Sequence, residues 1–381
     1  MGGGTPSTSK SEYWNGDIDW YAPAEIADQI YVSSSQKKIT QAGYDNSSAK
    51  MLPVGTVLFT SRAGIGKTAI LAQKGCTNQG FQSIVPHEGQ LDSYFIFSRT
   101  DELKKYGETT GAGSTFVEVS GKQMARMELL MPPTLSEQQE IGRFFASLDS
   151  TITLHQRKLE SMKLLKKSLL QKMFPKSGET VPEVRFPGFT DAWEQRKFAE
   201  LANIRRGLTY KPNDVTDSGI RVLRSSNINE DSFIENADDV FVKESAVNIS
   251  SVKDGDILIT SANGSNRLVG KHAIISKAGQ AVHGGFMLIA SAYGNPYFLN
   301  ASMSSSWYTN FVNMYVAGGN GAIGNLKKSD LENQVIRVPS EAEQLRIGQF
   351  FQSIDQTITL HQRKVEALQK LKKSLLQQMF V

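Results

Sequence analysis

A long segment of this chain occurs twice, nearly unchanged. Residues 137–174 have the sequence EQQEIGRFFASLDSTITLHQRKLESMKLLKKSLLQKMF, and residues 343–380 have the sequence EQLRIGQFFQSIDQTITLHQRKVEALQKLKKSLLQQMF. The offset is constant at 206 residues (361 − 155 for a matching histidine, 380 − 174 for a matching phenylalanine). A repeat of this length restricts the fold to two related halves, each a variable globular part followed by a nearly constant helical part.

A weaker similarity precedes each copy. LPVGTVLFTSRAGIGKTAI (52–70) aligns with VKDGDILITSANGSNRLVGKHAI (252–274), with a four-residue insertion in the second copy. Both stretches place β-like runs on either side of a polar, glycine-containing loop. We therefore expect a strand–loop–strand hairpin with a variable tip in each half.

The first of these loops also resembles a phosphate-binding loop. Gly66, Lys67 and Thr68 match its pattern, whereas Ser61 stands where the first glycine is required. The second copy has His272 where a phosphate-binding loop needs a hydroxyl group. A P-loop-like ATPase is therefore the weakest of the alternatives for this chain.

The repeated segments have the a/d pattern of a coiled coil, with apolar residues in alternating steps of four and three. The predicted helix–helix core consists of Leu148, Ile152, Leu159, Met162, Leu169, Ile354, Ile358, Val365, Leu368 and Leu375. The exposed faces are expected to be basic because of Lys163, Lys166, Lys167, Lys370, Lys372 and Lys373. The simplest partner for each apolar stripe is the other copy, which predicts two long antiparallel helices with a globular domain at each end.

The chain divides into five parts on composition and repeats. We expect a first variable domain at residues 1–133, a helix at 134–174, a linker at 175–189, a second variable domain at 190–339 and a helix at 340–381. The linker contains three prolines and two glycines, which end the helix. The variable domains alternate short β-like runs with polar loops and a few short helices, which predicts an α/β (α+β) fold with a curved sheet.

Neither variable domain has the pattern of a catalytic or metal site. The histidines of the two domains, His87, His272 and His283, do not recur at equivalent positions, and a single cysteine, Cys76, excludes an internal disulfide and a Cys-rich zinc site. No apolar run approaches the roughly 18 residues of a membrane span, and the N-terminus has no signal-peptide core. We expect a cytoplasmic protein without a metal or cofactor of its own.

The loops instead carry side chains suited to DNA, in a chain with a net charge of +4 and a pI of about 8.9. Arginine pairs with guanine and asparagine with adenine, while lysine and serine position phosphates. The candidates are Arg62 and Lys67 in the first domain, and Arg205, Arg206, Tyr210, Arg224, Ser225, Ser226, Asn227, Asn266, Arg267 and Lys271 in the second.

Divergent loops beside constant helices predict recognition of two different short sequences at a fixed separation. About 24 helical residues span roughly 36 Å, which is close to one DNA turn of about 34–36 Å. The main alternative is a non-catalytic protein scaffold, in which the coiled coil organises partners and the outer domains bind peptides.

These features together resemble the specificity subunit of type I restriction-modification enzymes over essentially the whole chain. The resemblance rests on GGTPSTSKSEYWNGDIDWY near the N-terminus, on the two hairpins, and on the doubled helical segment that flanks two divergent domains. It implies two target recognition domains held apart by two conserved antiparallel helices. Each domain would recognise one half of a split double-stranded DNA sequence.

The resemblance also implies protein partners. The helices would bind two methyltransferase (modification) subunits, which use S-adenosylmethionine to methylate adenine. Restriction subunits, which combine motor and nuclease, would use ATP and Mg²⁺. This chain would recognise the DNA sequence and serve as the scaffold, without a catalytic residue.

One departure from the family pattern lies at the N-terminus. The second domain has a leading segment, TDAWEQRKFAELANI (190–204), whereas the first domain begins almost at its glycines, MGGGTP. A different natural start and a sequence that is a piece of a longer chain are two interpretations that this departure leaves open.

Overall fold

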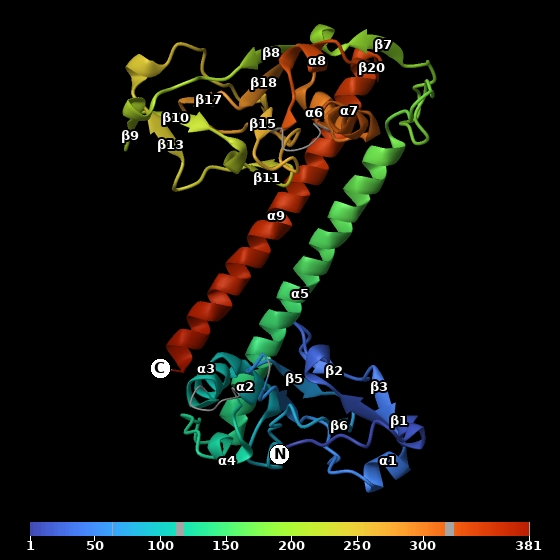
Figure 1. The fold of residues 1–381 in the computed structure, drawn as a ribbon, viewed down its shortest axis with the longest axis vertical. Helices are drawn as coiled ribbons and strands as arrows, with labels where there is room; N and C mark the ends of the chain where they lie inside the picture. The colour runs from blue at the N-terminus through green and yellow to red at the C-terminus, as the bar shows by residue number, and fades with distance from the viewer. Residues whose placement is uncertain (63, 112–117, 317–323, 381) are drawn as a thin grey trace. The chain divides into compact units, whose positions relative to one another are not determined.

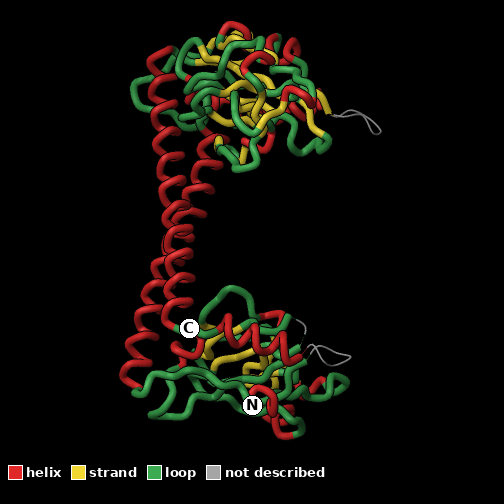
Figure 2. Tube along the Cα trace, turned by 90° about the vertical axis from the view of Figure 1, so that its left-hand side faces the viewer, coloured by secondary structure: helices red, strands yellow, loops and turns green. Residues whose placement is uncertain are grey.

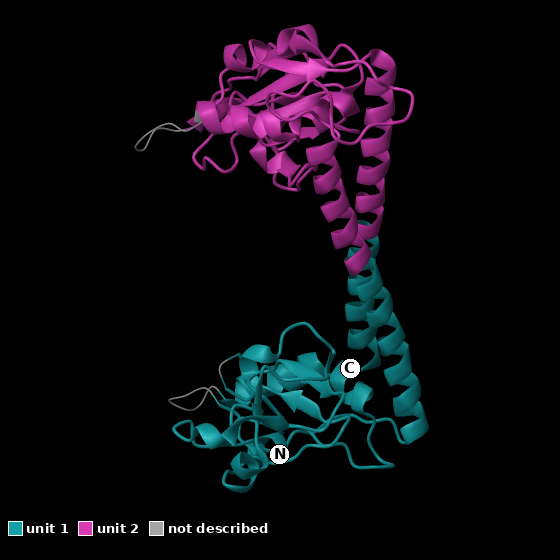
Figure 3. Ribbon diagram, turned by 90° about the vertical axis from the view of Figure 1, so that its right-hand side faces the viewer, with its two compact units in different colours: residues 1–156, 363–381 teal, residues 157–362 magenta. Residues whose placement is uncertain are grey.

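The computed structural model describes residues 1–62, 64–111, 118–316 and 324–380. The chain forms two compact units, unit 1 with residues 1–156 and 363–381, and unit 2 with residues 157–362 (Figure 3). Both long helices, α5 (Leu135–Lys172) and α9 (Glu341–Met379), contribute to both units. Among the described residues, no helix is both long and apolar enough to cross a membrane.

Unit 1 contains two small sheets and several short helices (Figure 1). One sheet has the order β3-β1-β6, with β1 (Trp14–Tyr21), β3 (Lys37–Ile39) and β6 (Cys76–Thr77). The other has the order β2-β5-β4, with β2 (Tyr31–Val32), β4 (Val57–Phe59) and β5 (Thr68–Leu71). The short helices are α1 (Gln41–Asp45), α2 (Ser93–Ser98), α3 (Thr100–Gly111) and α4 (Gly121–Met124).

Unit 2 has two four-stranded sheets. The first has the order β16-β14-β18-β8, with β8 (Ala202–Arg206), β14 (Ile257–Thr260), β16 (His272–Ile274) and β18 (Met287–Ala292). The second has the order β17-β10-β13-β9, with β9 (Val215–Thr216), β10 (Ile220–Leu223), β13 (Val240–Val242) and β17 (Ala281–His283).

Three strand pairs and three short helices complete unit 2. The pairs are β11 (Ile228–Asn229) with β12 (Ser232–Phe233), β15 (Ala262–Asn263) with β19 (Gly324–Asn325), and β7 (Glu194–Lys197) with β20 (Val335–Val338). The helices are α6 (Pro296–Met303), α7 (Ser306–Val316) and α8 (Lys328–Glu332).

The mixed α/β class is confirmed, but the single curved sheet expected for each variable domain is wrong. The strands of the described residues are two to eight residues long and long loops separate them (Figure 2). Gly55 and Gly255, which have positive φ, turn the chain just before β4 and β14. Each unit therefore builds its core from several small sheets.

In unit 1, the start of α5 lies antiparallel to the end of α9. Asp149 forms an ion pair with Lys372 at 2.6 Å, and the ring centroids of Phe145 and Phe380 are 6.3 Å apart. Residue numbers therefore rise along one helix as they fall along the other. Phe380 also packs edge-on against Phe95 of α2, which joins the end of α9 to the core of unit 1.

In unit 2, the remaining parts of the same helices are paired in the same way. Lys166 forms an ion pair with Asp355 at 2.8 Å, and the ring centroids of Phe174 and Phe351 are 6.1 Å apart. The predicted core positions are at most 9% exposed at Ile152, Leu159, Ile354 and Val365. They are half-buried at Leu148, Met162, Leu169, Ile358, Leu368 and Leu375.

A glycine in each repeat lies against the capped N-terminus of a short helix. A Cβ atom on Gly142 of α5 would clash with Asp92, the residue that caps α2 in unit 1. A Cβ atom on Gly348 of α9 would clash with Asn295, which caps α6 in unit 2. Each variable domain thus packs closely, through the start of one short helix, against a glycine of the long helix that follows it.

Candidate nucleic-acid interface

The glycine-containing loop of unit 1 is the turn of the β4–β5 hairpin. The Thr60 amide donates to the Lys67 carbonyl oxygen, and the Gly66 amide donates back to the Thr60 carbonyl oxygen, both at 3.0 Å. Gly66 has a φ of +93°, and a Cβ atom there would clash with Lys104 of α3. Both the backbone conformation and the packing therefore require glycine.

This geometry disfavours the phosphate-binding interpretation. A phosphate-binding loop leads into a helix whose N-terminus faces the ligand, whereas Thr68 here begins a strand. The Thr68 hydroxyl lies 2.7 Å from the Thr100 hydroxyl and is thereby occupied within the fold. Ser61 is fully buried. The expected strand–loop–strand hairpin is confirmed.

Unit 2 builds the same hairpin from β14 and β16. The Thr260 amide donates to the Lys271 carbonyl oxygen at 2.9 Å, and the Gly270 amide donates to the Thr260 carbonyl oxygen at 2.8 Å. Gly270 has a φ of +84° and its missing Cβ leaves room for Val312 of α7. The framework is the same in both units, and only the tips differ.

The two tips present different polar side chains. In unit 1, Lys67 is exposed, and Arg62 is exposed while its Nε lies 2.9 Å from a carboxylate oxygen of Glu118. In unit 2, Asn266 and Arg267 are exposed, whereas Lys271 is half-buried at the base of the hairpin. Cationic and amide groups therefore project from both tips, in different combinations.

The end of β8 supplies a second group in unit 2. Arg206 is exposed and Tyr210 is half-buried. Arg205 points into the unit instead, because its guanidinium lies 2.7 Å from Asp256, whose side chain is only 5% exposed. Arg205 therefore stabilises the fold here, and Arg206 is the arginine of this pair that faces solvent.

The loop after β10 contains a predicted DNA-contacting residue, Asn227, that the structure buries. Asn227 is fully buried: its amide donates to the Ile234 carbonyl oxygen at 3.0 Å and to Asp239 at 2.8 Å, and its side-chain oxygen accepts from the Arg224 amide. An asparagine in this position shapes the loop and is inaccessible to a base edge. The exposed residue of the loop is its neighbour Ser226.

Two other members of this loop are partly accessible. Arg224 is half-buried, and its Nε has no hydrogen-bond partner among the residues that the structure describes. Ser225 accepts a hydrogen bond at 3.0 Å from Asn263, which belongs to β15, the short strand that follows β14. This bond joins the loop after β10 to the segment that connects the strands of the hairpin.

The turn between β17 and β18 lies beside the same loops and was missed from the sequence. Leu208 forms a parallel bridge with Gly284, and a Cβ atom on Gly207 would clash with the Gly284 carbonyl oxygen. Phe286, two residues later, is 73% exposed. The Gly-Gly pair before it marks a close approach of two backbones, which is the signal that the sequence offered.

His283, which precedes this turn, is a structural residue. Burial lowers its pKa to about 4, and its Nε2 lies 3.2 Å from the Arg205 carbonyl oxygen. Within the described part of the chain, no group of three or more His, Cys, Asp or Glu side chains is placed to hold a metal ion.

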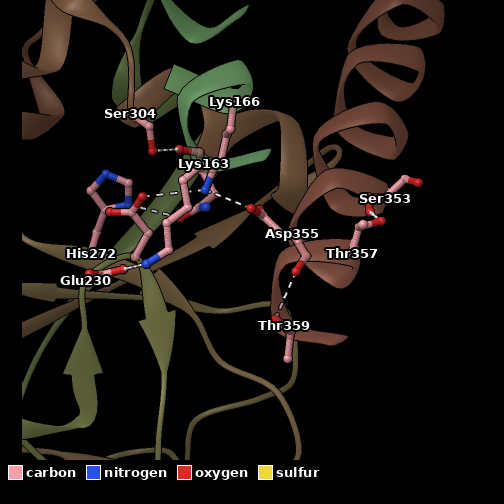
Figure 4. Close-up of polar contacts among 11 residues, drawn as sticks. Lys163, Lys166, Glu230, His272, Ser304, Ser353, Asp355, Thr357 and Thr359 are labelled. Atoms are coloured by element: carbon pink, nitrogen blue, oxygen red, sulfur yellow. Dashed lines mark hydrogen bonds and ion pairs between the residues drawn. The ribbon is translucent and has the colours of Figure 1, made fainter. Parts of the chain in front are cut away.

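A charge network in unit 2 joins α5 to the turn of the β11–β12 hairpin (Figure 4). Lys163 lies 3.1 Å from Glu230, and Lys166 lies 2.8 Å from Asp355 and 3.5 Å from Asp231. Burial alone would lower the pKa of Lys166, but the carboxylates of Asp355 and Asp231 raise it above its usual value. Lys166 therefore stays charged inside the unit.

The expected basic face of the helices needs correction at these positions. Lys166 is only 9% exposed, because it points toward carboxylates of its own unit rather than to solvent. Lys372 is half-buried against Asp149 in unit 1 for the same reason. The lysines of this set that are exposed are Lys167, Lys370 and Lys373.

Comparison with known proteins places these features in a family. The family described as type I restriction modification DNA specificity domain matches residues 1–164 and 190–370. The MjaIX type I restriction enzyme specificity subunit of Methanocaldococcus jannaschii is 26% identical over 388 residues, which cover 98% of this chain and 88% of that protein. The EcoR124I/EcoR124II specificity subunit of Escherichia coli is 29% identical over 157 residues, 39% of this chain and 38% of that one.

Solved structures share the fold. The S subunit of a type I restriction-modification system from M. genitalium has a TM-score of 0.63 at 13% identity, over 100% of this chain and 96% of that one. A chain from a structure concerned with complex assembly and conformational transition of the type I system has a TM-score of 0.52 at 15% identity, over 99% and 94% of the two chains. The chain therefore belongs to the family of DNA specificity subunits of type I restriction-modification enzymes.

Proposed function

We propose that unit 1 and unit 2 each recognise one half of a split, asymmetric DNA sequence. The observation that carries this proposal is the pair of hairpins. Their closing hydrogen bonds at Thr60 and Thr260 are the same, while their tips present Arg62 and Lys67 in one unit and Asn266 and Arg267 in the other. A retained framework with exchanged polar tips supports recognition of different bases by one common mode.

The other exposed groups of unit 2 support the same role. Arg206 ends β8, Tyr210 follows it, and Arg224 and Ser226 lie on the loop after β10; each can contact a phosphate or a base edge. Phosphate contacts by the cationic groups would hold the duplex in register, and the amide and hydroxyl groups would discriminate bases. Raising the ionic strength should then weaken DNA binding strongly.

We assign α5 and α9 the roles of spacer and docking surface. Their length would set the separation of the two half-sites, and their outward faces, which include Lys167, Lys370 and Lys373, would bind two methyltransferase subunits. In this proposal the chain itself is not catalytic. The methyltransferase subunits would use S-adenosylmethionine, and restriction subunits would use ATP and Mg²⁺.

The test is the methylation pattern of a host that carries this chain and its modification subunit. We expect methylated adenines in one split motif, detected by methylation-sensitive sequencing of the genome. Exchanging residues 1–133 for the first domain of another specificity subunit should change one half of the motif and leave the other half as it was. Changes in both halves, or methylation without a motif, would refute separate recognition by the two units.

A further inference from the structure

We infer that Phe286 contacts the methyl group of a thymine in the half-site recognised by unit 2. The inference rests on the proposed function and names one base contact within it. Three features of the described residues lead to it: how Phe286 is held, which side chains lie against its turn, and what unit 1 has at the same place.

Phe286 presents its ring to solvent from a fixed backbone. The next residue, Met287, is 1% exposed, whereas the Phe286 side chain is 73% exposed. The Phe286 carbonyl oxygen accepts hydrogen bonds from the amides of Ser261 at 2.9 Å and Ala262 at 3.1 Å. Single exposed apolar residues are common on protein surfaces. A phenyl ring on a turn that is hydrogen-bonded to the base of the β14–β16 hairpin is a different case.

The turn that precedes Phe286 lies against hydrogen-bonding side chains. It lies beside Thr209, at 3.3 Å from a Cβ placed on Gly285, and beside Arg224, at 3.8 Å from a Cβ placed on Gly284. The segments that meet here follow β8, β10 and β17 in unit 2 (Figure 1): β10 and β17 are paired strands of one sheet, and Leu208, after β8 of the other sheet, bridges to Gly284. The turn that carries the ring is therefore flanked by side chains suited to phosphates and base edges.

Thymine is the base whose major-groove edge carries a methyl group, and apolar side chains recognise it by contact. The hydrogen-bonding groups beside this turn can distinguish donors from acceptors, but they gain nothing from a methyl group. A rigid phenyl ring on the turn supplies the missing apolar contact. This complementarity favours thymine as the base that faces Phe286.

Unit 1 retains the backbone at this position but has no side chain. The Ser61 amide donates to the Gly80 carbonyl oxygen at 2.8 Å, as the Ser261 amide does to Phe286. Thr60 then bridges to Phe81, as Thr260 pairs with Met287. Gly80 is therefore the counterpart of Phe286. The phenyl ring is dispensable for the framework and distinguishes the two units, as a residue that determines specificity should.

The test uses the full chain with its modification subunit and a duplex that contains the split motif. Each thymine of the unit 2 half-site is replaced in turn by deoxyuridine, which lacks only the methyl group. For the wild type, we expect one replacement to weaken binding about fourfold, the effect of one buried methyl group. Phe286→Ala should weaken binding to the thymine duplex roughly tenfold and should be insensitive to the same replacement.

Controls separate this contact from other effects. Tyr293→Ala removes another exposed ring of unit 2, 67% exposed, and should leave the deoxyuridine response as in the wild type. Phe286→Leu should retain part of the response. Methylation specificity at the unit 1 half-site should not change in any variant, which confirms assembly.

Two results would overturn the inference while leaving the proposed function intact. One is a wild-type complex that binds its split motif with no deoxyuridine response in the unit 2 half-site. The other is a Phe286→Ala variant that responds as the wild type does. A wild-type complex that methylates no split motif would instead refute the proposed function, and the inference would fall with it.

Discussion

In unit 1, the ammonium nitrogen of Lys372 lies 2.6 Å from one carboxylate oxygen of Asp149, and the Tyr94 hydroxyl donates to the other at 2.9 Å. Lys166 and Asp355 are the repeat equivalents of Lys372 and Asp149, and they form the corresponding ion pair in unit 2. In one pair the lysine comes from α9, and in the other it comes from α5. The same two repeat positions therefore form an ion pair between the helices twice, and the helix that supplies the lysine in one pair supplies the aspartate in the other.

Lys372→Met should destabilise unit 1 by about 1–3 kcal/mol. The Asp149 side chain is 9% exposed and would retain the Tyr94 hydroxyl but lose its cation. Urea unfolding measures the loss, and the exposed neighbour Lys373→Met is the matched control. Equal stability of the two variants would show that the ion pair contributes nothing to the fold.

Asn227→Ala should reduce stability without a selective change in DNA recognition. The substitution leaves the Arg224 amide, the Ile234 carbonyl oxygen and Asp239 without their partner in a buried site, which costs about 1–3 kcal/mol. Thermal unfolding measures this loss. Ser226→Ala, one residue away and exposed, should unfold like the wild type and alter DNA binding only. The reverse pattern would make Asn227 a base-contacting residue after all.

Two neighbouring substitutions separate the structural and binding roles of the β4–β5 hairpin. Gly66→Ala should destabilise unit 1 by about 1–3 kcal/mol, because φ is positive and Lys104 occupies the Cβ site. Lys67→Ala should leave stability unchanged and reduce the salt dependence of DNA affinity by about one phosphate contact. Substitution of the exposed linker residue Lys176 by alanine is the control for the loss of one positive charge. An effect of Lys67→Ala on ATP binding by this chain would revive the phosphate-binding interpretation.

Unit 2 should lose stability in mild acid because of His283. Burial lowers the pKa of His283 to about 4, so the folded state stays neutral while the unfolded state binds a proton below pH about 6.5. Its contribution is fully present above pH about 6.5 and is lost as the pH falls toward 4, by up to about 3 kcal/mol. His283→Gln should flatten this part of the pH profile of the unfolding free energy. Buried His272, whose pKa burial also lowers, keeps its own contribution in the variant and serves as an internal reference.

Lengthening both long helices should widen the gap in the DNA motif. One added heptad preserves the a/d register in α5 and α9 and adds about 10 Å of helix, or roughly three base pairs. We expect a motif with the same two halves and a longer gap, or loss of methylation if the rotated half-sites no longer face both units. A methylated motif with an unchanged gap would refute the spacer role.

Periodicity and repetition predicted the parts of this fold whose residues act locally. The a/d pattern places Ile152 and Ile354 where the structure buries them, and the aligned loops anticipated two equivalent hairpins. Lys166 was assigned to an exposed basic face because of its charge. Its burial depends on Asp231 and Asp355, which are distant in sequence and whose proximity no local pattern reveals.

Residue type predicted which loops are polar but not the direction of each side chain. Asn227 and Ser226 are adjacent polar residues in one loop, and the positions of Ile234 and Asp239 favour burial of the first. Arg205 is drawn inward by Asp256 in the same way. Phe286 was missed because an apolar residue in a β-rich region reads as core, and its exposure follows from the register of the next strand.

The two glycines Gly142 and Gly348 have a consequence for how such a chain evolves. Each lies against the cap and first turn of one short helix, at Asp92 and Phe95 or at Asn295 and Phe298, and the proposed recognition loops are other segments of that domain. Substitutions in the loops can therefore change the DNA sequence that a domain recognises without altering the contact between that domain and its long helix. New target sequences can then evolve while the helices, and the partners that bind them, stay the same.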